Sequence, residues 1–218
     1  MMKYISATIL LIMFLSSACL QNITKQSSTP FLEEMVIDSV WAANKVSFAI
    51  RTVEDQQYVA YYDRNRMMTV AKRNLGSSQW AKKTLPNRLK WDSHNYVALG
   101  IDESGYIHVS GNMHVDPLVY FRSTVPFSVD SFEQLNYMVG QDEDDVTYPK
   151  FLYTKNYDLL FSYRSGSSGN GNSLINRFDP KTKTWSRYLH KPLFKGISDN
   201  GNRSAYHQYR KDLSLIHI

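Results

Sequence analysis

The chain alternates short apolar runs with polar turns, and one strand–turn–strand phrase occurs three times. The three copies lie at 58–80 (YVAYYDRNRMMTVAKRNLGSSQW), 106–132 (YIHVSGNMHVDPLVYFRSTVPFSVDSF) and 158–185 (DLLFSYRSGSSGNGNSLINRFDPKTKTW). Each contains an apolar strand, a polar turn, a second strand and a closing turn that ends on an aromatic residue. The copies start 48 and 52 residues apart. Repeats of roughly 40–50 residues with four short strands each are typical of β-propeller blades, so the pattern predicts an all-β propeller.

The repeat divides the chain into blades. The strands that we expect are 47–51, 58–63, 67–73 and 79–84 in the first blade, 96–102, 106–111, 118–123 and 132–138 in the second, and 150–154, 158–164, 172–178 and 184–189 in the third. At roughly 45 residues per blade, residues 39–212 hold about three to four four-stranded blades, which is a partial propeller. We therefore expect a fragment of a longer protein, in which 213–218 is a truncated or non-native tail.

The first 19 residues have the pattern of an export signal. Lys3 supplies a positive charge, 9–15 is a short apolar run, and small residues at 16–18 precede Cys19. Cys19 is the one cysteine of the chain, and its position resembles that of the lipidated cysteine in bacterial lipoproteins. The alternative is an ordinary secretory signal that is cleaved after the small residues. Both interpretations predict export, to the bacterial cell surface or outer membrane as a lipoprotein, or to the periplasm or medium, and 20–38 then reads as a polar tether.

Charge and composition narrow the classes of partner. The formal net charge of +5 favours anionic partners such as an acidic polysaccharide. Nucleic acid is not expected, because an exported chain without a clustered Lys/Arg stripe lacks the usual electrostatic footprint. The membrane is expected as a partner only through an N-terminal lipid anchor, and we expect a monomer.

No cofactor or metal is expected from the chain as it stands. The acidic run 141–145 lacks the spaced ligands of a calcium loop and reads as a solvated turn. No Cys/His cluster indicates zinc. A structural Ca²⁺ or Zn²⁺ in a missing part of the protein is left open.

Four segments carry a resemblance to a known family. WDSHN at 91–95, GYIHVSGNMHVDPLVYFRS at 105–123, YRSGSSGNGNSLINRFD at 163–179 and NRSAYHQYRKD at 202–212 resemble the BNR-4 repeat family. That family contains bacterial seven-bladed propellers, among them ulvan lyases, which cut an acidic seaweed polysaccharide by β-elimination. The resemblance implies the propeller fold and a polysaccharide lyase that acts on a uronate-containing glycan.

β-Elimination on a uronic acid needs a base for the proton next to the carboxylate, a cation that neutralises the carboxylate, and an acid for the departing oxygen. Histidine and tyrosine suit the first and third roles, and arginine suits the second. The resemblance implies His94 and His114 as the base and its partner. It implies Tyr163 as the proton donor and an arginine of the same hairpin as the neutraliser; Arg177 is preferred there over Arg164.

Four further residues are expected to contact substrate: Arg164, Asn95, Tyr206 and Arg210. If the lyase interpretation is right, His94, His114, Tyr163 and Arg177 must converge on one cleft. His108 alternates with apolar neighbours inside a strand, so we expect it to be structural.

Two other classes of function stay open at this point. One is a non-catalytic cell-surface propeller whose aromatic residues stack on sugars. The other is a sialidase-like hydrolase, which would need an arginine cluster with a paired acid and nucleophile; the sequence offers no convincing arrangement of that kind.

Overall fold

The computed structural model describes residues 34–197, 201 and 203. The predicted export signal, Cys19 and most of the tether lie outside the described residues, as do Tyr206, Arg210 and the tail. Within the described part of the chain, no helix is long and apolar enough to cross a membrane.

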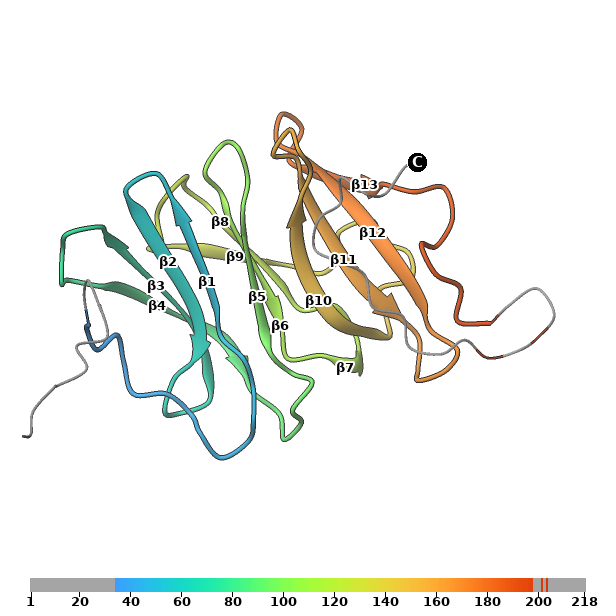
Figure 1. Ribbon diagram of the computed structural model, residues 1–218, viewed down its shortest axis with the longest axis horizontal. Helices are drawn as coiled ribbons and strands as arrows, with labels where there is room; N and C mark the ends of the chain where they lie inside the picture. The colour runs from blue at the N-terminus through green and yellow to red at the C-terminus, as the bar shows by residue number, and fades with distance from the viewer. Residues whose placement is uncertain (1–33, 198–200, 202, 204–218) are drawn as a thin grey trace, which may run out of the picture. The chain divides into compact units, whose positions relative to one another are not determined.

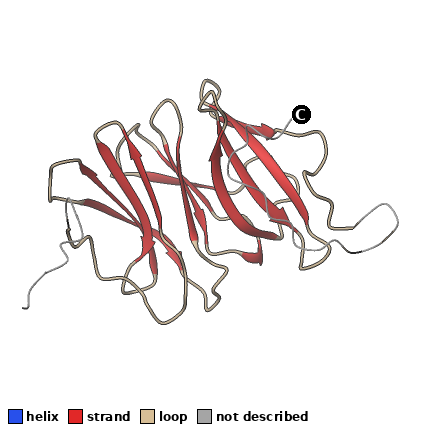
Figure 2. Cartoon of the chain, viewed as in Figure 1, coloured by secondary structure: helices blue, strands red, loops and turns tan. Residues whose placement is uncertain are grey.

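The described residues form three antiparallel β-sheets, one for each predicted blade (Figures 1 and 2). The sheet orders are β1-β2-β3-β4, β5-β6-β8-β9 and β13-β12-β11-β10-β7. The strands are β1 (Ala49–Val53), β2 (Gln56–Tyr62), β3 (Met67–Asn74), β4 (Ala81–Arg88), β5 (Val97–Ile101), β6 (Ile107–Gly111), β7 (His114–Asp116), β8 (Tyr120–Ser123), β9 (Phe132–Leu135), β10 (Val146–Tyr153), β11 (Leu159–Ser165), β12 (Asn172–Asp179) and β13 (Thr184–Arg187). The all-β prediction is confirmed.

The first strand of each sheet lies beside the first strand of the next, with β5 against both β1 and β10. At the end where these strands begin, the amide of Asn44 donates to the carbonyl of Asp92 (3.3 Å), and the ring of His94 contacts that of Tyr148. At the other end, the backbone N–H of Ile101 donates to the hydroxyl of Tyr153 (2.8 Å). We call the end where β1, β5 and β10 begin the proximal end, and the other the distal end.

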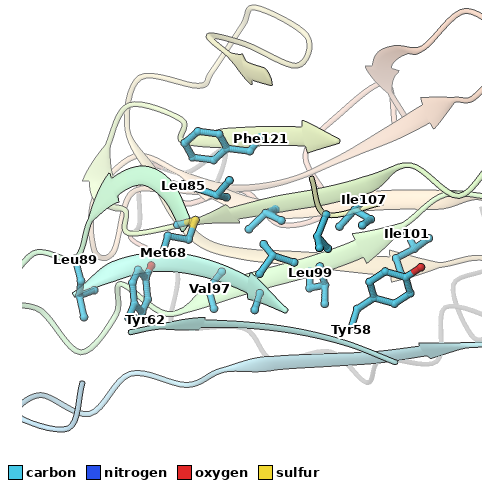
Figure 3. Packing of buried hydrophobic residues seen from close by; sticks show 14 residues of the cluster. Tyr58, Tyr62, Met68, Leu85, Leu89, Val97, Leu99, Ile101, Ile107 and Phe121 are labelled. Carbon is cyan, nitrogen blue, oxygen red and sulfur yellow. The ribbon is translucent and has the colours of Figure 1, made fainter. Parts of the chain in front are cut away.

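Apolar side chains fill the space between neighbouring sheets. Between the first and second sheets, Tyr58, Met68, Leu85, Ile107 and Phe121 belong to one buried cluster (Figure 3). These residues alternate with others on the opposite faces of their strands, as period-two side chains must. A second cluster joins the second and third sheets, and its largest fully buried members are Tyr120, Phe161, Tyr163 and Phe178. Each blade therefore depends on its neighbour to cover one apolar face.

The third sheet departs from the expected pattern at one place. β10 begins at Val146 rather than at 150, and it pairs with a short additional strand, β7, which lies between β6 and β8 in the sequence of the second blade. The register of β10 shifts between Thr147 and Lys150, where Tyr148 has a φ of 61°. This is a β-bulge, which tolerates Pro149 because the ladder is interrupted there. Residues 146–149, to which the sequence analysis assigned no strand, therefore belong to β10, which pairs through β7 with a segment of the second blade.

His108 is a core residue, as expected. Its side chain is fully buried, with Nδ1 2.7 Å from the hydroxyl of Tyr120 and Nε2 3.2 Å from Oδ2 of Asp102. Burial lowers the pKa of His108, and the neighbouring Asp102 opposes that shift without overcoming it. The imidazole is therefore neutral in the folded protein.

A neutral buried histidine makes stability depend on pH. Below the ordinary histidine pKa of about 6.5, unfolded His108 binds a proton while folded His108 does not, so the free energy of unfolding falls as pH falls. We expect the melting temperature to drop between pH 7 and pH 5, and His108→Gln to flatten part of that slope. Thermal unfolding of the wild type, His108→Gln and the exposed control His190→Gln measures this. A His108→Gln slope equal to that of the wild type contradicts the assignment.

Candidate active site

Two histidines share one carboxylate at the proximal end. Nδ1 of His94 lies 2.6 Å from Oδ1 of Asp92, and Nδ1 of His114 lies 2.7 Å from Oδ2 of the same residue. The two imidazole rings stack with their centroids 4.1 Å apart. His94 precedes β5 and His114 begins β7, so the second blade supplies all three groups. The structure thus places His94 and His114 side by side, while their catalytic roles stay a prediction.

Asp92 fixes the hydrogen positions of both rings. Burial alone would raise the pKa of Asp92, but the backbone N–H of His94 and the two imidazoles outweigh it and hold that pKa at about 2. The ionised carboxylate can only accept hydrogen bonds, so both Nδ1 atoms must donate. In the neutral rings, each Nε2 then carries a lone pair and can act as a base.

Tyr148 lies next to this pair because of the bulge in β10. Its ring makes an edge contact with His94, at a centroid distance of 5.7 Å. A tyrosine with a φ of 61° is a backbone outlier, and such outliers cluster at functional sites. Tyr148 is only partly buried. The bulge directs its side chain toward the histidines, as the ring contact with His94 shows. The irregular strand brings a phenol to the imidazole pair.

Arg164 completes the cluster from the neighbouring strand. Thr147 is directly opposite His114 on one side of β10 and opposite Arg164 on the other. The Thr147 hydroxyl oxygen accepts from Nη2 of Arg164 (3.1 Å) and from the backbone N–H of Val115 (2.8 Å). The guanidinium carbon of Arg164 lies 5.0 Å from the ring centroid of Tyr148. One buried threonine thus ties the strand of His114 to the arginine.

The guanidinium of Arg164 is buried but has a free donor. The residue is 8% exposed and its Nε donates to the carbonyl of Gly166 (3.0 Å), yet Nη1 is buried and has no hydrogen-bond partner among the described residues. Gly171 makes room for the side chain, since a Cβ there would lie 2.7 Å from Cγ of Arg164. A buried cationic donor without a partner is costly and fits a site for an anionic ligand.

Tyr163 does not join this cluster. It lies on the face of β11 that packs between the second and third sheets, and it is 2% exposed. Its hydroxyl accepts from Nη1 of Arg187 (3.0 Å) and lies 3.5 Å from the carbonyl of Gln141. Burial raises the pKa of Tyr163. These contacts are those of a core residue.

Arg177 lies at the other end of its strand. It is opposite Leu160 in the β11–β12 ladder, whereas Arg164 is opposite Ser173, four residues away along β12. At about 3.3 Å per residue, this separates the two positions by about 13 Å along the strand. The guanidinium of Arg177 pairs instead with Asp158 at the distal end (3.0 Å). The expectation that His94, His114, Tyr163 and Arg177 converge is therefore wrong for Tyr163, which is a core residue, and for Arg177.

Asn95 is beneath the site rather than on its surface. The residue is 1% exposed, and its backbone carbonyl accepts a hydrogen bond from Tyr62 (2.8 Å). Its side-chain Oδ1 is buried without a partner among the described residues. Direct contact with substrate, as expected from the sequence, is not evident from this position.

Sequence reasoning missed Tyr148 and gave Asp92 no role. Tyr148 lies outside the strands expected from the sequence, and the chain has 15 tyrosines with nothing to single it out. One signal was available: Pro149 lies within the stretch VTYPKFLY at 146–153, which is rich in β-branched and aromatic residues, and a proline at a strand position indicates an edge or a bulge. Asp92 lies in the segment 91–95 that carried the family resemblance, but only the structure shows both imidazoles on its two oxygens.

The same three side chains are of types that bind metal ions. Candidate ligand atoms of Asp92, His94 and His114 lie within 4.8 Å of one another. Two imidazoles and a carboxylate can hold Zn²⁺. Here, however, Asp92 already binds both Nδ1 atoms, so a metal ion would have to break those hydrogen bonds or use the Nε2 atoms. The arrangement suits proton transfer without rearrangement.

Comparison with known proteins places the chain in a family. The model of a BNR repeat-containing family member matches residues 56–218, and the chain belongs to this family. The ulvan lyase, long isoform, of Alteromonas sp is 23% identical over 211 residues, which cover 74% of this chain and 20% of that protein. The corresponding lyase of Glaciecola sp. (strain KUL10) is 26% identical over 141 residues, covering 47% and 14%. The chain thus spans a fifth or less of these relatives.

Solved structures support the same fold. The crystal structure of polysaccharide lyase Uly1 matches with a TM-score of 0.58 at 17% identity, over 73% of this chain and 45% of that one. A PL25 ulvan lyase bound to -[GlcA(1-4)Rha3S]- matches with a TM-score of 0.56 at 17% identity, over 73% and 40%. The three sheets of this chain are therefore similar to part of an ulvan lyase propeller.

The double hydrogen bond to Asp92 predicts one tautomer for both imidazoles. In ¹⁵N-histidine-labelled protein at a pH where the rings are neutral, we expect protonated Nδ1 and unprotonated Nε2 for His94 and His114. In Asp92→Asn the side chain has one oxygen acceptor in place of two, so at least one ring should lose this preference. NMR shifts of the ring nitrogens report it, with exposed His190 as the reference. Protonated Nε2 in the wild-type pair contradicts the geometry.

Proposed function

We propose that this protein is a polysaccharide lyase that cleaves an anionic, uronate-containing glycan by β-elimination. The observation that carries the proposal is the buried, unpartnered Nη1 of Arg164 beside Tyr148 and the histidine pair. The three groups that β-elimination needs occur together at one end of two adjacent blades. Arg164 is the cation for the carboxylate, the histidines are bases for the proton, and Tyr148 is the phenol that protonates the leaving oxygen. The family relationship to ulvan lyases favours the same class of reaction.

Arg164 is the group that binds the uronate carboxylate. In water a carboxylate keeps its full negative charge, which resists removal of the neighbouring C5 proton. A guanidinium that is already desolvated and fixed by Gly166 and Thr147 loses little further entropy on binding, and it neutralises the charge that builds up on the carboxylate in the transition state. Arg164 therefore replaces Arg177 as the proposed neutraliser.

The histidine pair accepts the proton from the sugar, and Tyr148 donates a proton to the leaving group. The Nε2 of an imidazole in the pair takes the C5 proton, the C5–H electron pair forms the C4=C5 double bond, and the C4–O bond breaks. The departing sugar oxygen receives the proton of the Tyr148 hydroxyl. The imidazolium, held by ionised Asp92, returns a proton to the Tyr148 phenolate after release. The edge contact between His94 and Tyr148 provides a short route for that return.

The glycan class follows from the same groups. Elimination requires a carboxylate next to the abstracted proton, so the bound sugar must be a uronate. A relative of the same fold was solved with a glycan of glucuronate and sulfated rhamnose, and we take a sulfated uronate polysaccharide of the ulvan type as the substrate. The net charge of +5 agrees with a polyanionic ligand.

The proposal predicts which variants lose activity. In the full-length protein, His114→Ala and Tyr148→Phe should each lower kcat by about 10²–10⁴, because each removes a proton-transfer group. Arg164→Gln should lower kcat by about 10²–10³, as loss of a charge-stabilising donor does. Ultraviolet absorbance of the unsaturated uronate product measures the rate on ulvan and on other acidic polysaccharides.

Two variants serve as matched controls from the same hairpin. Tyr163→Phe and Arg177→Gln change the same residue types outside the cluster, and we expect kcat close to the wild-type value for both. Saturated products would identify a hydrolase instead of a lyase. Binding without any product, unaffected by His94→Ala, would leave a non-catalytic glycan-binding propeller. A large loss in Arg177→Gln with none in Arg164→Gln would overturn the assignment of the neutraliser.

A further inference from the structure

An exposed tryptophan lies three residues before His94. Trp91 is 66% exposed, although tryptophan side chains are on average among the more buried. Its indole meets that of Trp41 edge to face, with centroids 5.4 Å apart at 75°. Trp91 is thus supported from one side and leaves much of its ring open to solvent. An open, supported indole face is the surface on which sugar rings stack.

A cation accompanies the two indoles. The guanidinium carbon of Arg66 lies 5.5 Å from the ring centroid of Trp41 and 5.7 Å from that of Trp91. Among the described residues, no carboxylate forms an ion pair with Arg66. Its backbone is fixed on both sides: the N–H donates to the carbonyl of Asp63 (2.8 Å), and the carbonyl accepts from the N–H of Leu89 (2.8 Å). Arg66 therefore presents a positioned, unneutralised charge beside the indoles.

The same residues are joined to the candidate active site. Nε1 of Trp41 donates to Oδ1 of Asn44, and the amide of Asn44 donates to the backbone carbonyl of Asp92 (3.3 Å). Trp91 is adjacent to Asp92 in the sequence and three residues from His94. A span of three residues is at most about 11 Å. One polysaccharide chain can therefore contact the histidine pair and the indole at once.

We infer that Trp91, Trp41 and Arg66 form a binding subsite for a sulfated sugar that neighbours the uronate in the polysaccharide chain. The apolar face of the sugar stacks on Trp91, and the sulfate ester binds the guanidinium of Arg66. The inference rests on the proposed function for the identity of the polysaccharide. It assigns to Trp41 and Arg66 of the first blade a role in substrate selection, whereas the catalytic groups come from the second and third blades.

The test compares affinity and turnover in the full-length protein. Trp91→Ala should weaken binding to ulvan about tenfold and raise KM with little change in kcat, while Trp91→Phe should restore most of the affinity. Arg66→Gln should weaken binding to ulvan but not to chemically desulfated ulvan. Affinity electrophoresis in gels that contain each polysaccharide measures binding, and product absorbance measures kcat and KM. Tyr157→Ala is the control, because Tyr157 is 73% exposed but lies in the distal turn between β10 and β11.

Each outcome either supports or overturns the subsite. Affinity of Trp91→Ala equal to that of Tyr157→Ala overturns it, provided that the variants melt at the wild-type temperature. Equal losses of Arg66→Gln on sulfated and desulfated ulvan overturn the assignment of the sulfate. Failure of the proposed function gives a different result. If no glycan yields product but binding still depends on Trp91, the lyase proposal is wrong and the subsite stands. Full lyase activity with no effect of Trp91→Ala removes the subsite alone.

Discussion

The geometry of the candidate site depends on the irregular start of β10. Val146 and Thr147 pair with β7 on one side and with β11 on the other, and the bulge at Tyr148 and Pro149 interrupts the β10–β11 ladder before Lys150. In a regular strand, the backbone of Tyr148 would pair with the neighbouring strand. Pro149 would then interrupt that ladder, because proline has no backbone N–H to donate. Because Thr147 is opposite both His114 and Arg164, the same stretch sets the separation of the imidazole pair and the guanidinium. Packing of the second blade on the third thereby determines the chemistry.

Asp92 determines which ring nitrogens of His94 and His114 carry protons. Its two carboxylate oxygens hold two imidazoles in a stacked pair, and its low pKa of about 2 keeps it ionised near neutral pH. This orients both rings and supports positive charge on either one. The sharing of one carboxylate by two histidines makes the pair a single unit, so the removal of either ring should disturb the other.

The sequence was sufficient for the fold and for half of the candidate site. Period-two alternation and turn residues predicted twelve of the thirteen strands, because most blade strands are short and buried on a face, but they did not predict β7. His94 and His114 could be found because they lie in segments typical of the family. Tyr148 and Arg164 were harder, since their proximity arises from a bulge and a cross-strand register that alternation does not encode. The choice of Arg177 failed for the same reason: both arginines belong to one hairpin, but antiparallel pairing places them at opposite ends.

The distribution of charge also separates the two ends of the blades. At the distal end, the guanidinium of Arg177 is neutralised by Asp158 (3.0 Å). At the proximal end, the guanidinium of Arg164 keeps a donor without a partner, and Arg66 has no ion pair among the described residues. These two guanidinium groups at the proximal end attract an anionic ligand to it.

The most direct test is the structure of the full-length His114→Ala protein with a uronate oligosaccharide bound. The account predicts that the uronate carboxylate accepts a hydrogen bond from Nη1 of Arg164, with the sugar ring between Tyr148 and His94. An oligosaccharide whose carboxylate binds at the distal end near Arg177, or one that leaves Nη1 of Arg164 without a partner, would contradict it.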